Sequence, residues 1–266
     1  MKQEHLGFRS LMHEQTEWPA EKIALEDLHV IADRYLRVLP LCAKSDVLEL
    51  GAGSSIGKTE LSQTVASYIS IDISSENILR TRDFCQRHEL LQCQGDASRL
   101  PFRADSFDVV IALAMIYYLD PGKLLKEVAH VLRPGGKLFF CTSNKEVPGF
   151  VPAPGSREYL NTYEWNKLLG AHGFTSKFEG VFEKKHVIPL GPRAKLISFS
   201  KRILAKTGFG WIWSLLRGLV KGPSYKIPSE LEKFPEHNYK RVELDPNSTN
   251  DVHRVIYCEC KLLAAK

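Results

Sequence analysis

The chain has 266 residues, of which 44% are hydrophobic, so it can bury the core of one large domain. Its formal net charge is +5, but ten of its 36 Lys and Arg residues lie within 184–229, a stretch that contains no Asp or Glu. The rest of the chain is therefore net acidic, so the basic character belongs to one segment and not to the core.

Targeting and metal-binding patterns are missing from the sequence. The longest nearly uninterrupted apolar run, 109–119, is shorter than the ~20 residues of a membrane-spanning helix, and the first residues lack the apolar core of a signal peptide. The six cysteines form no C-x-x-C pair, and neither His nor acidic residues cluster at metal-ligand spacing. We therefore expect a cytoplasmic protein with reduced thiols and no metal.

The first half of the chain alternates predicted helices and strands. A helix is expected from Trp18-Pro19 to Pro40, because proline is tolerated in a first helical turn and apolar residues follow at helical spacing. The next expected elements are a strand over 46–50, a helix after a glycine loop to Ala66, a strand over 68–72, and a helix capped by Ser74 that runs toward His88.

The second half continues this alternation and then becomes less regular. Strands are expected over 90–94 and 107–112, and a helix from Asp120-Pro121 to Pro134-Gly135-Gly136. Further expected elements are a strand over 137–142, a loop over 147–155, a helix capped by Thr162 that runs through His172, a strand over 174–182, and a final strand over 255–262. In this last strand Cys258 and Cys260 share one face, where we expect them to be buried.

The loop Gly51-Ala-Gly-Ser-Ser-Ile-Gly-Lys-Thr59 allows three interpretations. A dinucleotide-binding G-x-G-x-x-G fingerprint fails because position 56 is Ile. The end Gly57-Lys58-Thr59 matches a phosphate-binding loop in which Ala52 replaces the first glycine, but the strand over 107–112 ends without an acid to hold magnesium. The third interpretation is a nucleoside ligand without phosphates, approached by the backbone of Gly51 and Gly53, with Asp72 binding its ribose diol.

The ordered motifs of the chain resemble those of class I S-adenosylmethionine-dependent methyltransferases, in the subgroup that includes many small-molecule, sugar and lipid modifiers. The matching positions are Glu49-x-Gly51-x-Gly53, Asp72, Gly95-Asp96-Ala97 with Leu100-Pro101-Phe102, Asp105-x-Phe107-Asp108, and Leu132-Arg-Pro-Gly-Gly136. The resemblance covers about residues 25–182 and the last strand. It implies a doubly wound α/β fold with a seven-stranded, mostly parallel sheet whose last strand is antiparallel.

The resemblance also implies how S-adenosylmethionine would be held. Glu49, Gly51, Ala52 and Gly53 would bind its methionine end, and Asp72, with Ile73 beside it, the ribose hydroxyls. Asp96 and Ala97 would face the adenine edge. The backbone of Ala112 and Leu113 would face the amino-acid moiety.

The sequence departs from the family in the loop and at the acceptor side. Ser55 stands where the family usually has a third glycine, and the segment Leu113–Tyr118 lacks the acid or histidine often found there. No Asn/Asp-Pro-Pro-aromatic loop is present, so nucleobase and protein-glutamine acceptors are not expected. Tyr117 and Tyr118 lie where they could contact the acceptor as catalytic candidates, although a tyrosine in an apolar run is more often a packing residue.

The domain organisation that we expect has three parts. Residues 1–183 form the methyltransferase core with an N-terminal helical cap, 184–250 a basic amphipathic helical insertion, and 251–266 the final strand. Within 192–221, cations interleave with apolar residues and with Trp211 and Trp213, a composition typical of interfacial membrane helices. A lid over the acceptor, a subunit contact and a site for an anionic membrane or lipid remain open, with nucleic acid the least favoured partner.

The function implied is methyl transfer from S-adenosylmethionine to a small or lipid-linked acceptor, such as a sugar hydroxyl of a glycan precursor. Two alternatives remain. One is a phosphate-loop nucleotide-binding protein, and the other is a non-catalytic methyltransferase-like module that acts through its basic helices.

Overall fold

The computed structural model describes residues 16–54, 56–88, 90–183, 224–236 and 238–264. Its centre is a sheet of eight strands in the order β4-β3-β2-β5-β6-β10-β7-β9. These strands are β2 (Asp46–Leu50), β3 (Ser67–Asp72), β4 (Leu91–Gln94), β5 (Phe107–Leu113), β6 (Leu132–Ser143), β7 (Phe174–Glu183), β9 (Val242–Leu244) and β10 (His253–Leu262).

The strand directions follow the predicted doubly wound pattern. The five strands from β4 to β6 in the sheet order are parallel to their neighbours. β10 is antiparallel to both β6 and β7. The expected sheet with an antiparallel last strand is therefore confirmed, but it has one strand more than expected. β9 lies within the predicted insertion and pairs with the outer edge of β7.

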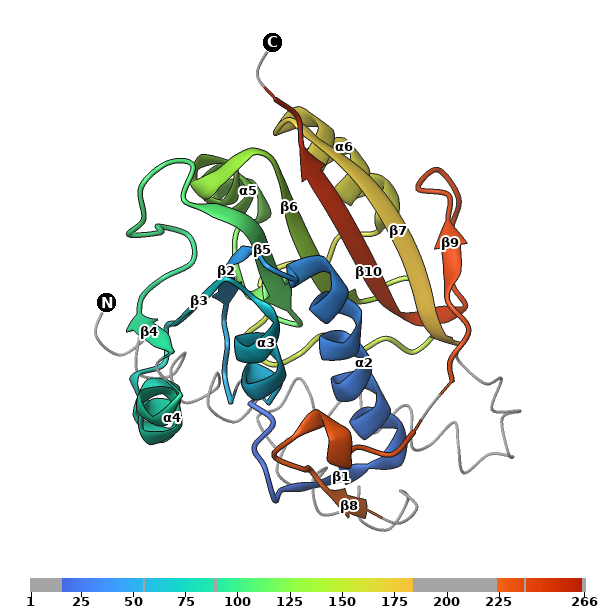
Figure 1. Ribbon diagram of the computed structural model, residues 1–266. Coiled ribbons are helices and arrows are strands. Elements are labelled where there is room, and N and C mark those ends of the chain that lie inside the picture. The colour runs from blue at the N-terminus through green and yellow to red at the C-terminus, as the bar shows by residue number, and fades with distance from the viewer. Residues whose placement is uncertain (1–15, 55, 89, 184–223, 237, 265–266) are drawn as a thin grey trace.

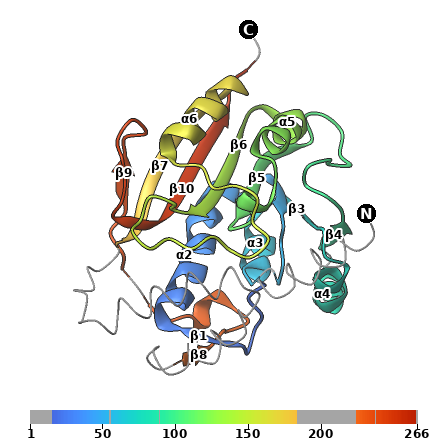
Figure 2. The ribbon, with the colours of Figure 1, turned by 180° about the vertical axis from the view of Figure 1, so that it is seen from behind.

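Helices cover both faces of the sheet. α2 (Leu25–Cys42) and α3 (Lys58–Thr64) lie on one face, whereas α5 (Pro121–Val131) and α6 (Thr162–Ala171) lie on the other (Figures 1 and 2). Each face has its own apolar core, which contains Leu28 and Ile31 of α2 on the first side and Leu124 and Trp165 on the second. α4 (Ser75–Arg87) lies at the β4 end of the sheet (Figure 1). Because both faces are covered, the strands bury apolar side chains on both sides.

The first helix starts later than the sequence predicts. Pro19 is followed by a turn in which Ala20 has a φ of 72° and donates its N–H to the Ile227 carbonyl at 2.8 Å. The short strand β1 (Lys22–Ala24) then pairs antiparallel with β8 (Ser224–Lys226), and α2 begins only at Leu25. The prediction of a helix from Trp18-Pro19 was therefore wrong. The backbone groups of residues 20–24 bond instead to β8 and Ile227, about 200 residues later in the chain.

Most of the other helix ends follow the local capping signals. Ser74 accepts a hydrogen bond from the Asn77 N–H at 3.2 Å, and Asp120 accepts one from the Lys123 N–H at 3.1 Å, as predicted. The cap of α6 is Asn161 and not Thr162, which is the first helical residue. Asn161 and Glu164 form a reciprocal capping box, which satisfies two backbone N–H groups that the helix itself leaves open.

Only part of the predicted insertion is described. Residues 192–221, with Trp211 and Trp213, lie outside the described residues. The described part after them includes β8, a short 3₁₀ turn over Leu231–Lys233 and β9, and it buries Ile227, Leu231 and Phe234 in the core beside α2. Over the part of the chain that the structure describes, no helix is long and apolar enough to cross a membrane.

The last strand places its cysteines as predicted. Cys258 and Cys260 are fully buried on one face of β10, and their sulfur atoms lie 3.3 Å apart without forming a disulfide.

Candidate functional site

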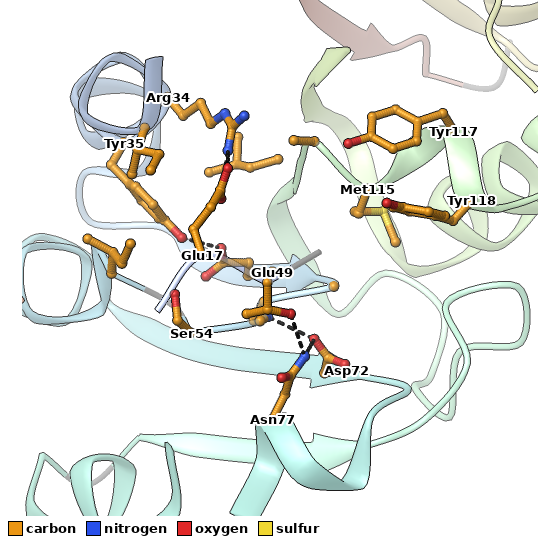
Figure 3. Close-up of a pocket in the computed structure, with 18 residues that line it drawn as sticks. Glu17, Arg34, Tyr35, Glu49, Ser54, Asp72, Asn77, Met115, Tyr117 and Tyr118 are labelled. Carbon is orange, nitrogen blue, oxygen red and sulfur yellow. Dashed lines mark hydrogen bonds and ion pairs between the residues drawn. The ribbon is translucent and has the colours of Figure 1, made fainter. Parts of the chain in front are cut away.

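A cavity of about 180 Å³ lies at the carboxyl ends of β2, β3 and β5 (Figure 3). Parallel strands of an α/β sheet bring their carboxyl ends to one edge, where such folds bind ligands. The lining residues come from an N-terminal segment, α2, the glycine loop, β3, α4 and the turn after β5. They are Thr16, Glu17, Ile31, Arg34, Tyr35, Glu49, Gly51, Ala52, Gly53, Ser54, Ile56, Asp72, Asn77, Leu113, Ala114, Met115, Tyr117 and Tyr118.

The glycine loop is tightly packed at the floor of this cavity. Gly51 and Gly53 have φ angles of 62° and 51°, in the left-handed region that favours glycine. A Cβ atom on Gly51 would lie 2.9 Å from the Met115 Cβ atom, so a larger residue would displace the turn after β5. The Gly53 N–H donates to the Asp72 carboxylate at 2.7 Å, which ties the loop to the end of β3.

Asp72 is a buried acceptor with several donors. Its side chain also accepts the Ser74 N–H at 2.8 Å and the Asn77 amide at 3.4 Å. Burial raises the pKa of Asp72, whereas the hydrogen bonds from Ser74 and Gly53 oppose that shift. The side-chain carbonyl oxygen of Asn77 is buried beside it without a hydrogen-bond partner. Asp72 and Asn77 together therefore offer acceptors for a ligand's hydroxyl groups.

Glu49 is the second buried acid of the cavity, only 1% exposed. It accepts a hydrogen bond from the Tyr35 hydroxyl at 3.3 Å and another from the Tyr68 hydroxyl. Burial raises the pKa of Glu49 to about 7, against the lowering effects of the Tyr68 bond and of Lys58. Near neutral pH this carboxyl is therefore poised to ionise when a cationic ligand group approaches.

An ion pair crosses the cavity from the N-terminal segment to α2. The Arg34 guanidinium lies 3.2 Å from the Glu17 carboxylate, and Figure 3 shows Glu17 reaching in between the α2 wall and the wall formed by the two tyrosines. Burial lowers the pKa of Arg34, but Glu17 raises it and the net shift is upward. The buried Nε of Arg34 has no partner. Arg34 can therefore bind an anionic ligand group, for which Glu17 competes.

Aromatic side chains form the wall opposite α2. Tyr117 packs against Tyr118 and stacks on Tyr159, with ring centroids 4.7 and 4.6 Å away, and Phe150 meets Tyr159 edge-on. Burial raises the pKa of Tyr117 and of Tyr118 well above the usual phenol value. Both phenols stay protonated, so they suit contact with a ligand or hydrogen-bond donation better than proton abstraction.

The cavity brings together eight of the twelve residues singled out from the sequence: Glu49, Gly51, Ala52, Gly53, Asp72, Leu113, Tyr117 and Tyr118. Four others do not line it. Ala112 is buried within β5 and Ala97 in the core, and Ile73 is half-buried at the end of β3. Asp96 is exposed one strand farther out, where its side chain accepts bonds from the N–H and hydroxyl of Ser98.

Several lining residues escaped the sequence analysis. Arg34 and Tyr35 lie on a helix whose spacing indicated an apolar face but not which polar residues meet the sheet edge. Asn77 lies three residues after the helix cap Ser74, so the predicted cap could have indicated that Asn77 lies near the end of the preceding strand. Nothing in the local sequence marked Glu17, because its role depends on how the N-terminal segment crosses the cavity.

Lys58, the lysine of the phosphate-loop motif, does not line the cavity. It is fully buried and donates to the Cys85 sulfur at 3.3 Å. A phosphate-binding loop would direct this ammonium toward the ligand, so the geometry does not favour that interpretation. Within the described ranges, no group of three or more His, Cys, Asp or Glu residues could hold a metal ion.

The raised pKa of Glu49 predicts a pH-dependent stability. The folded protein holds its proton up to about pH 7, whereas the unfolded chain releases it near the ordinary value of 4.5, so stability falls between these values as pH rises. The cost is on the order of 3 kcal/mol. Glu49→Gln removes this cost. Urea unfolding of the ligand-free protein should show the variant gaining stability relative to wild type from mildly acid to mildly alkaline pH.

The exposed Glu158→Gln is the matched control for this prediction and should show no such trend. A Glu49→Gln variant whose stability relative to wild type does not change with pH would contradict the assignment.

Comparison with known proteins shows that part of the chain is similar to methyltransferases. Residues 48–140 match the family described as a methyltransferase domain. A demethylmenaquinone methyltransferase of Mycobacterium marinum is 34% identical over 136 residues, covering 48% of this chain and 56% of that protein. A ubiquinone biosynthesis O-methyltransferase of Coxiella burnetii is 28% identical over 149 residues, covering 53% and 62%. The chain thus spans less than two thirds of the length of these relatives.

A solved structure extends the likeness beyond the matched segment. The S-adenosylmethionine-dependent methyltransferase of Thermotoga maritima, described as a possible histamine N-methyltransferase, aligns with a TM-score of 0.53 over 88% of this chain and 90% of its own, at 16% identity. At that identity the likeness shows the fold alone. Residues 48–140 are therefore similar to a methyltransferase domain, within a chain that has the Rossmann-like fold seen in S-adenosylmethionine-dependent methyltransferases.

Proposed function

We propose that the protein transfers a methyl group from S-adenosylmethionine to a small or lipid-linked acceptor. The observation that supports this most directly is the pair of buried carboxylates, Glu49 and Asp72, at the ends of adjacent parallel strands on either side of the glycine loop. The cofactor carries an ammonium group and a ribose diol, and two buried acids at this edge suit those two groups.

Each polar part of the cofactor has a counterpart in the cavity. Asp72 and Asn77 would accept the ribose hydroxyls, and Glu49 with the backbone from Gly51 to Gly53 would take the ammonium end. Arg34 would bind the methionine carboxylate, because a guanidinium pairs with a carboxylate through two parallel hydrogen bonds. Ala112 and Leu113 would lie beside the amino-acid moiety, as the family resemblance implies.

The adenine site is proposed at Asp96 and Ala97, with Ile73 next to the ribose acceptor Asp72. These residues lie outside the cavity lining, but the Gly95 N–H donates to the Asp72 carbonyl at 3.0 Å. The turn after β4 is thus joined to the end of β3, one strand beyond the ribose acceptors.

The transfer itself is an in-line displacement at a sulfonium methyl group. Orientation of the two reactants can lower such a barrier by ~7–11 kcal/mol, and the residues placed to orient them are Met115, Tyr117 and Tyr118. The described lining offers no free base, since Glu17 is paired with Arg34 and both phenols are protonated. Acceptors that ionise readily therefore suit this pocket better than the sugar hydroxyl that the sequence suggested, which would need a base.

Two relatives support a lipid-linked acceptor by name, since one is a demethylmenaquinone methyltransferase and the other a ubiquinone biosynthesis O-methyltransferase. The aromatic wall formed by Tyr117 and Tyr118, with Tyr159 stacked on Tyr117, suits a flat or apolar acceptor. The basic segment 192–221 would then bring the protein to an anionic membrane or lipid.

The cofactor proposal predicts a selective thermal shift. S-adenosylhomocysteine should raise the melting temperature, because a ligand that binds the native state stabilises it, whereas Mg-ATP should not. Asp72→Asn should weaken S-adenosylhomocysteine binding by ~1.5–3 kcal/mol through loss of charge-assisted bonds, while Asp83→Asn, an exposed control on α4, should not. Stabilisation by Mg-ATP alone would revive the phosphate-loop alternative. Cofactor binding without turnover of labelled methyl groups in a cell extract would indicate the non-catalytic module.

The ion pair across the cavity predicts opposite effects for its two members. Arg34→Met should weaken S-adenosylhomocysteine binding by ~1.5–3 kcal/mol, and Glu17→Gln should strengthen it because a competing carboxylate is removed. Arg37→Met, one turn away and paired with Glu179 outside the cavity, is the control. Isothermal titration calorimetry gives all four dissociation constants. Weaker binding by Glu17→Gln would show that Glu17 holds the ligand and does not compete with it.

The basic segment predicts a salt-sensitive membrane contact. The protein should co-sediment with vesicles that contain anionic lipid but not with neutral ones, because each engaged cation adds about 1 kcal/mol near such a surface. Added salt should weaken the binding, and the pair Trp211→Ala/Trp213→Ala should reduce it. If the protein ignores both vesicle types and the paired variant melts early, the tryptophans are packing residues and the membrane proposal fails.

A further inference from the structure

Lys58 is the first residue of α3 and directly follows the glycine loop, yet the proposed cofactor contacts do not use it. Its side chain is 0% exposed. Its ammonium group donates a hydrogen bond to the sulfur of Cys85, a residue of α4, at 3.3 Å. A sulfur atom is a weak acceptor, and a buried lysine is costly unless opposite charge lies close by.

The opposite charge comes from the two buried acids of the cavity. Burial raises the pKa of Glu49 of β2 and of Asp72 of β3, and the charge of Lys58 opposes that shift in both. The other titratable groups that surround this set are the hydroxyls of Tyr35 on α2 and Tyr68 on β3, which donate to Glu49, and the Cys85 thiol on α4. Lys58 is thus a cation that both carboxylates share.

The preceding glycine explains how Lys58 reaches this position. A Cβ atom on Gly57 would lie 2.1 Å from the Tyr35 ring, so only glycine lets the start of α3 pack this closely against α2. The next residue, Lys58, is then carried into the interior between α3 and α4. The Gly57-Lys58 pair, which resembles a phosphate-binding loop in the sequence, has a packing reason here that involves no phosphate.

We propose that Lys58 is a positioning residue of the cofactor site, whose buried ammonium group supplies the counter-charge that favours the ionised carboxylates of Glu49 and Asp72 when the ligand binds. This inference rests on the proposed function. Without the ammonium group, Glu49 would hold its proton more firmly at neutral pH and would more often offer a neutral carboxyl to the cofactor's ammonium end. The lysine would therefore act through the two acids and would not touch the ligand.

The test compares Lys58→Met with Cys85→Ala across pH. Cys85→Ala removes the sulfur contact but keeps the charge. Calorimetry of S-adenosylhomocysteine binding should show Lys58→Met roughly tenfold weaker than wild type at neutral pH, the effect of a shift of about one pKa unit. The deficit should shrink at alkaline pH, where both acids ionise without help. Because each variant is compared with wild type at the same pH, titration of the ligand's own amine cancels.

Two outcomes overturn the proposal: a deficit that is the same at every pH, which indicates packing alone, or no deficit. If Lys58→Met does not fold by circular dichroism, Lys58→Met/Glu49→Gln decides the question, since neutralising one acid should restore folding if charge is the cause. Failure of the double variant to fold overturns the proposal. Absence of binding by wild type contradicts the proposed function itself, whereas wild-type binding with a pH-independent deficit contradicts only the role of Lys58.

Discussion

The burial of two carboxylates at the ends of adjacent parallel strands is the constraint on which the rest of the site depends. Glu49 and Asp72 are nearly inaccessible to water, so the protein must supply donors and opposite charge in its place. Asp72 receives backbone N–H groups from the glycine loop and from the start of α4, and Glu49 receives two tyrosine hydroxyls. The glycines, the Ser74 turn and the position of α2 all follow from this need.

These arrangements favour ligand binding at the expense of the ligand-free fold. A carboxyl such as Glu49, with its pKa raised by burial, destabilises the protein once it ionises. Arg34 is likewise held in the cavity with Glu17 as its partner. A ligand with one ammonium, one carboxylate and a diol would provide a partner for Glu49, Arg34 and Asp72 at once, and this links the cost of burying these groups to the proposed function.

The parts of the fold that could be predicted are those set by local signals. Strand periodicity, the glycine loop and the caps at Ser74 and Asp120 need only neighbouring residues, and they located the seven predicted strands and the starts of α4 and α5. The turn at Ala20, the pairing of β1 with β8 and the added strand β9 depend on partners far away in the sequence. Local patterns could not show them.

The candidate site was predictable to the same extent. Acids at strand ends and glycines in a tight loop have positional signatures, so Gly51, Gly53 and Asp72 could be found, and the family resemblance added Glu49. Arg34 lies on the α2 wall of the cavity, and Glu17 reaches into the cavity from the N-terminal segment. Their ion pair depends on how α2 and this segment pack together. Lys58 matched the end of a phosphate-binding motif in the sequence, because sequence spacing does not reveal the direction in which a side chain points.

The central claim, that buried acids receive a nucleoside ligand through its ammonium group and ribose diol, is tested most directly by proton exchange on binding. Calorimetry of S-adenosylhomocysteine at neutral pH, repeated in buffers of different ionisation enthalpy, counts the protons exchanged. Since burial raises the pKa of Glu49 to about 7 and the group should ionise beside the ligand's ammonium group, binding should release a substantial fraction of one proton. The Glu49→Gln variant should release far fewer protons on binding than the wild-type protein. Binding without proton release, or with proton uptake, would contradict the account.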